Sequence, residues 1–177
     1  MSMPFTAANE LSHIFSFNDE DLVDNRLNLL GAHQTIKLQE ELDGTRRRLY
    51  QLVYGTLGLI AFILIYGFVS RNEQVINVSS IVLVLGGLLS LSNYLELQSL
   101  KADFTNRRVE IIESQRVFIT HWGNTRGWKD YVQVGSNLLK ISTLEAHALH
   151  IFLKRQPAGV LRIYYLPKTK RVVAAEK

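Results

Sequence analysis

The sequence predicts a membrane hairpin of two transmembrane α-helices that carries a small α+β domain. Two observations lead to this fold class. Two long apolar runs, Leu49–Ser70 and Gln74–Leu95, are separated only by Arg71, Asn72 and Glu73. Beyond them the hydrophobic pattern changes to short alternating runs, which are typical of strands.

Each apolar run is long enough to cross a bilayer. The hydrocarbon core is about 30 Å thick, and a helix crosses it in roughly 20 residues. Neither run contains Asp, Glu, Lys or Arg, and one such charge near the centre of a span would cost about 2.5–3.5 kcal/mol. The alternative is a pair of helices buried in a soluble core. Such helices normally show a polar stripe, which these runs lack.

Basic residues beside the runs predict the orientation. The basic residues just before the first run are Arg46, Arg47 and Arg48, and those that follow the second run are Lys101, Arg107 and Arg108. The connecting loop has only Arg71, offset by Glu73. Because cytoplasmic flanks carry the excess of Lys and Arg, both termini are expected in the cytoplasm, with the six basic residues at the surface of an inner or plasma membrane.

The sequence then divides into three parts: a cytoplasmic helical arm at 1–48, the hairpin at 49–97 and a cytoplasmic β-rich domain at 101–177. Residues 1–51 hold five Lys/Arg and eight Asp/Glu, whereas residues 101–177 hold fourteen and six, a net of +8. This basic tail is expected to bind either anionic lipid headgroups or the acidic arm. Its charge would also suit nucleic acid, but no nucleic-acid-binding motif accompanies it, so no nucleic-acid partner is expected.

In the arm, Asn18 and the three acidic residues after it have the pattern of a capped helix N-terminus. This helix is expected to end near Gly31. A second polar helix, about Gln34–Leu49, leads into the membrane, with a possible bend at Gly44.

Small and amide residues recur at helical spacing inside the two runs. They are Gly55, Gly58 and Ala61 in the first run, and Gly86, Ser90 and Asn93 in the second. Such residues let helix backbones approach closely. They predict contact between the two spans, and the alternatives are homo-oligomerisation or docking on a larger membrane complex. A pore of oligomerised hairpins is a further alternative. The acid that could belong to an ion path, Glu96, lies at the end of a span, where it can reach water, and one acid does not make a relay.

The tail predicts five or six short strands and one helix. The expected strands lie in Val109–Ile119, Tyr131–Val134, Leu138–Ile141, Leu161–Tyr165 and Arg171–Val173, and the helix is about Leu144–Arg155, opened by a Ser142–Glu145 capping box. Such a set favours a strongly bent sheet or partial barrel resembling SH3-like or OB-type modules.

A glycine-bearing segment, residues 122–128, is expected to form a loop in this domain. Its Trp122, Arg126 and Trp128 are the candidate partner-contact residues. The two tryptophans are expected either to pair across a hairpin or to rest on the lipid interface.

The chain resembles a class of uncharacterised small two-span membrane proteins with a C-terminal β-rich domain. The resemblance rests on Phe17–Arg26, Leu161–Pro167 and Ala174–Glu176. Two positions depart from the pattern, because Ser114 stands where glycine is expected and Leu139 where phenylalanine is expected. The resemblance implies this architecture and no established activity.

Candidate chemistry is sparse. The chain has no cysteine, which excludes disulfides and thiolate chemistry. His147 and His150 are spaced to share a metal, but no third ligand follows at suitable spacing, and two surface histidines are the alternative. No phosphate-binding loop, nucleophile elbow or zincin motif occurs. No catalytic residue, metal, cofactor or small-molecule substrate is therefore expected.

These features predict a non-enzymatic accessory, scaffold or assembly subunit that holds a small cytoplasmic domain at the membrane. Its partners are expected to be membrane lipid and either another protein or a second copy of the chain. The main alternative is a membrane-surface module that reads anionic lipid or acts as a sensor.

Overall fold

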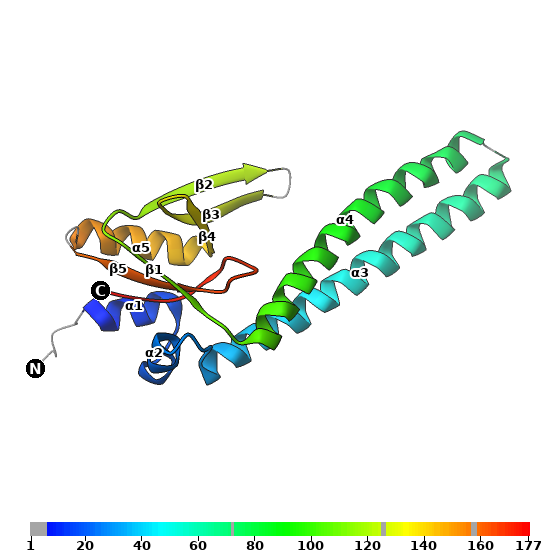
Figure 1. Cartoon of the computed structure of the whole chain (residues 1–177). Helices are drawn as coiled ribbons and strands as arrows, with labels where there is room; N and C mark the ends of the chain where they lie inside the picture. Colours follow the sequence, from blue (N-terminus) through cyan, green and yellow to red (C-terminus); the bar gives the residue numbers. More distant parts are fainter. Residues whose placement is uncertain (1–6, 72, 125–126, 157–158) are drawn as a thin grey trace, which may run out of the picture. The chain divides into compact units, whose positions relative to one another are not determined.

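The computed structural model describes residues 7–71, 73–124, 127–156 and 159–177 (Figure 1). Contacts divide the chain into two compact units. The first, which we call the α+β domain, comprises Met1–Lys37 and Ala102–Lys177. The second, which we call the hairpin, comprises Leu38–Lys101.

The hairpin is built from most of two long helices, α3 (Ala32–Ser70) and α4 (Glu73–Asn106), and the first residues of α3 and the last of α4 belong to the α+β domain. Both are long and apolar enough to cross a membrane, with mean hydropathies of 2.2 and 1.7 over their most apolar 18 residues. The two predicted spans lie inside these helices. The predicted polar helix Gln34–Leu49 is part of α3, which continues through Gly44.

Two short helices, α1 (Ala7–Phe15) and α2 (Asp19–Arg26), precede the hairpin. The predicted cap at Asn18 is confirmed, because its side chain accepts a hydrogen bond from Asp21 N at 2.7 Å. The prediction that the helix ends near Gly31 is wrong. Asp24 O accepts the N–H groups of both Leu27 and Leu29, which turns the chain after Arg26, and Gly31 directly precedes α3.

Six strands form two three-stranded antiparallel sheets. The first has the order β1 (Glu110–Ser114), β5 (Leu161–Tyr165), β6 (Val172–Glu176), and the second has β2 (Phe118–Asn124), β3 (Gly127–Val134), β4 (Asn137–Ile141). The sequence predicted one bent sheet, but β1 pairs with β5 instead of with its neighbour β2. An isolated bridge between Lys140 and Arg171 joins the two sheets. The expected strands Tyr131–Val134 and Leu138–Ile141 lie within β3 and β4, which pair antiparallel as a hairpin, and the turn of this hairpin contains Gly135 at φ +60°.

One helix, α5 (Thr143–Arg155), completes the domain, and its predicted Ser142–Glu145 capping box is confirmed. Its buried face comprises Ala146, Leu149 and Phe152. Helix α1 contacts both α5 and β6 and buries Leu11 and Phe15. Helix α1 and the β-rich tail therefore share one hydrophobic core.

Candidate functional site

The apolar side chains of the hairpin are largely uncovered. In the most apolar window of each long helix only 6% of the residues are buried. Phe62 and Ile65 on α3, for example, expose 67% and 66% of their surface, and Val84 on α4 exposes 60%. A helix in the core of a soluble protein would bury such residues.

Helices α3 and α4 meet at a small buried glycine. A Cβ added at Gly86 would collide with the side chain of Thr56, so the close approach requires glycine. Ser90 is half-buried on the same helix. Asn93 is half-buried too, but its amide bonds to Leu89 O at 2.8 Å, within its own helix.

The small residues of α3 lie elsewhere. A Cβ on Gly55 or Gly58 would meet nothing within 4 Å, and Ala61 is exposed. The partly covered positions of this part of α3 recur with helical period, and Gly55, Gly58 and Ala61 fall outside them. These positions are Leu49, Leu52, Val53, Thr56, Ile60 and Ile63. Of the predicted small-residue contacts, the second-helix set lies at or near the contact between α3 and α4, and the first-helix set does not.

The six predicted membrane-surface residues are exposed but belong to different units. Arg46, Arg47 and Arg48 lie on α3 and Lys101 on α4, within the hairpin; Arg107 and Arg108 lie in the α+β domain, after α4.

The segment before α3 and the segment after α4 are joined by backbone hydrogen bonds. Leu30 N donates to Arg107 O at 3.0 Å, and Val109 N donates to Asn28 O at 3.1 Å. Arg107 has a left-handed backbone, φ +48°, which ends α4 and turns the chain into β1. Two connectors that are distant in sequence therefore form one antiparallel junction inside the domain.

A buried carboxylate fixes the β5–β6 turn to the last part of α4. Asp103 is 0% exposed, and its two oxygens accept the backbone N–H groups of Lys168 at 3.0 Å and Thr169 at 2.8 Å. Sequence reasoning missed this residue. No local pattern connects an acid near a helix end to a turn 65 residues away.

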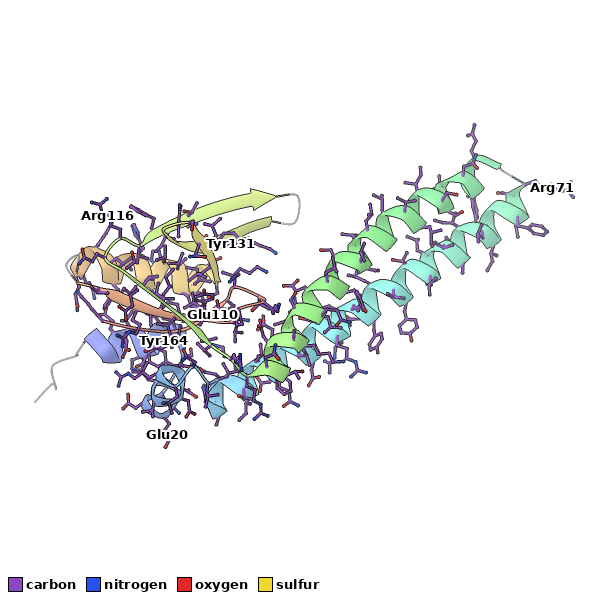
Figure 2. All side chains as sticks on the ribbon, viewed as in Figure 1. Glu20, Arg71, Glu110, Arg116, Tyr131 and Tyr164 are labelled. Carbon is purple, nitrogen blue, oxygen red and sulfur yellow. The ribbon has the colours of Figure 1, made fainter. Side chains whose placement is uncertain are left out.

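Glu176 is the centre of a second cluster, which joins α2 to the first sheet. Its carboxylate accepts hydrogen bonds from Arg26, Tyr164 and Arg162, the last at 2.9 Å. Arg162 also bonds to Glu113 on β1 at 2.6 Å. Burial alone would raise the pKa of Glu176, but the hydrogen bonds from Arg26, Tyr164 and Arg162 outweigh it and lower this pKa to about 2. Figure 2 shows Tyr164 within the domain.

The predicted partner loop is largely two paired strand ends. The register places Trp122 opposite Lys129 and Trp128 opposite Gly123, so the two tryptophans are not directly opposite each other. Arg126 and the side chains of Trp122 and Trp128 lie outside the described residues, and their contact role stays a prediction.

His147 and His150 are exposed on α5. Within the part of the chain that the structure describes, no three His, Cys, Asp or Glu side chains are grouped so that they could hold a metal ion.

Comparison with protein-family models, with curated proteins and with solved structures finds no match to this chain.

Proposed function

We propose that this chain is an integral membrane protein whose hairpin anchors the α+β domain at the cytoplasmic face of an inner or plasma membrane. The observation that carries the proposal is the exposure of α3 and α4, since 6% of each apolar window is buried. Large contiguous apolar surfaces are rare on soluble monomers and mark a membrane or a partner. A bilayer covers both helices at once.

The orientation rests on the basic flanks. Arg46, Arg47 and Arg48 precede the apolar part of α3, and Lys101 follows that of α4. The turn carries only Arg71, offset by Glu73. This asymmetry favours retention of both termini in the cytoplasm.

The function that this arrangement supports best is a non-enzymatic accessory or scaffold role. Anchoring raises the effective concentration of the domain near membrane-bound partners. Gly55, Gly58 and Ala61 support a contact within the membrane, because this chain leaves them uncovered. Another helix, from a second copy or from a different membrane protein, could approach closely there.

Alkaline extraction followed by cross-linking tests the proposal. The full chain should stay with membranes at high pH, whereas a peripheral protein would be released. A photo-cross-linking residue at Ala61 should give a discrete adduct with a second copy or with one membrane protein, and one at Leu85, on α4, serves as the control. Release at high pH would overturn the anchoring. Adducts to lipid alone at both positions would overturn the scaffold contact.

A further inference from the structure

The β5–β6 turn gathers basic residues from three separate parts of the sequence. Lys140 N, on β4, donates to Lys170 O at 2.6 Å, and Lys140 also bridges to Arg171. Lys168 is tied through its backbone to Asp103, whose own carbonyl accepts Arg107 N at 2.9 Å. Figure 1 shows this turn as the red loop between β5 and β6.

We call this set of basic residues the turn patch. Its members are Arg107, Arg108, Lys140, Lys168, Lys170 and Arg171. Arg107, Arg108 and Lys168 are exposed, and the other three are partly exposed.

Among the described residues, two carboxylates have contacts with the turn: Glu110 pairs with Lys170, and Asp103 bonds to the backbone. Glu110, labelled in Figure 2, lies 3.6 Å from Lys170 Nζ. Asp103 is buried, and its oxygens accept the two backbone N–H groups of the turn. The six cations outnumber these two carboxylates by four.

Apolar side chains adjoin the patch. A groove of about 750 Å³ is lined by Arg108 together with Leu27, Leu29 and Ile111. These three side chains are exposed by 65%, 49% and 37%. Cations beside exposed aliphatic groups are the combination that membrane-surface segments use, the cations for phosphate and the aliphatic groups for the acyl boundary.

We propose that the turn patch binds the headgroups of anionic lipids and so seats the α+β domain on the bilayer. The proposal rests on the anchoring proposed above. An acidic protein would also match the charge of the patch. Lipid is favoured because the patch is tethered close to the bilayer: Asp103, which holds the turn, comes only eight residues after Leu95, the end of the second apolar run. Each basic residue near an anionic surface contributes about 1 kcal/mol.

Lysine footprinting of the full chain in lipid nanodiscs tests the proposal. A neutral acetylating reagent is applied in discs of phosphatidylcholine alone and in discs that also contain phosphatidylglycerol. Acetylation of Lys168 and Lys140 should slow about fivefold in the anionic discs, the factor that about 1 kcal/mol represents. Lys154, exposed near the end of α5, is the internal control and should not change. About 0.5 M salt should remove the difference by screening.

Two charge-reversal variants sharpen the test. Lys168→Glu should largely abolish the lipid-dependent protection of Lys140, whereas Lys154→Glu, with the same change of charge, should leave it intact. Equal acetylation of Lys168 in both kinds of disc overturns the proposal. Slowing by soluble polyglutamate but not by lipid would also overturn it and assign the patch to an acidic protein. Failure to enter discs at all would instead refute the anchoring.

Discussion

The carboxylate of Asp103, near the end of α4, accepts a hydrogen bond from the backbone N–H of Thr169 at 2.8 Å, in the turn between β5 and β6. The same side chain holds Lys168 N at 3.0 Å. One buried acid therefore fixes the turn that carries much of the turn patch to the segment that leaves the hairpin.

Asp103→Ala should destabilise the α+β domain by about 2–4 kcal/mol, because it leaves two backbone N–H groups without their acceptor in a buried place. Thermal unfolding of the full chain in detergent, followed by circular dichroism, measures the loss. Glu40→Ala, which removes an exposed acid from α3, is the control and should change stability by less than about 0.5 kcal/mol. Equal effects would show that Asp103 does not hold the turn.

Glu176 should make the domain sensitive to acid. Its pKa is lowered from 4.5 to about 2, so its contribution is present above pH 4.5 and is lost as the pH falls toward 2. After allowance for solvent screening we expect about 1–2 kcal/mol. Glu176→Gln should therefore lose less stability than the wild type between pH 5.5 and pH 3. Parallel losses in the two proteins, measured by chemical unfolding, would contradict the cluster around Glu176.

Gly86 and Gly87 provide a matched pair for the contact between α3 and α4. Gly86→Leu should weaken the hairpin by about 1–3 kcal/mol, because the new side chain collides with Thr56. At Gly87, one residue further on, an added Cβ would meet nothing within 4 Å, so Gly87→Leu should be neutral or stabilising. Resistance to unfolding in sodium dodecyl sulfate compares them. A larger loss of stability in Gly87→Leu than in Gly86→Leu would contradict the contact at Gly86.

Gly31 and Gly44 distinguish a packed glycine from an open one. A Cβ on Gly31 would overlap the backbone and side chain of Asp21, so Gly31→Ala should destabilise the domain by more than about 1 kcal/mol. Gly44 lies inside α3, and a Cβ added there would meet nothing within 4 Å. Gly44→Ala should stabilise that helix by about 0.5–1 kcal/mol, the difference in helix propensity. Thermal unfolding of both variants checks the signs, and a stable Gly31→Ala protein would contradict the packing.

The elements that local patterns specify were predictable from the sequence. The apolar runs, the caps at Asn18 and Ser142 and the hairpin around Gly135 depend on residues within a few positions of each other. The structure has each of them near its predicted place.

Long-range pairing was not predictable in this way. The strand order follows from β1 pairing with β5. The sites at Asp103 and Glu176 join residues 66 and 150 positions apart in the sequence. The face of α3 that meets α4 also did not follow from the small residues of the first apolar run. Small residues at helical spacing show where close approach is possible, and only the packing of Thr56 against Gly86 shows where it occurs within the chain.

Part of the turn patch is visible in the sequence as a local cluster of basic residues, which the net charge of the whole tail does not single out. Lys168, Lys170 and Arg171 fall within four consecutive positions, between the expected strand Leu161–Tyr165 and the one that begins at Arg171. The contribution of Lys140 depends on the bridge between the two sheets, which no local pattern contains.

The central claim, that the hairpin spans a membrane and keeps the domain on the cytoplasmic side, is tested most directly by single-cysteine labelling. The chain has no cysteine of its own, so Arg71→Cys, at the end of α3 (Figure 2), and Ser136→Cys, in the exposed β3–β4 turn, each give one thiol. In intact cells an impermeant maleimide should label Arg71→Cys and spare Ser136→Cys until the membrane is opened. Labelling of Ser136→Cys alone would reverse the orientation. Protection of both until the membrane is opened would contradict the two-span anchor.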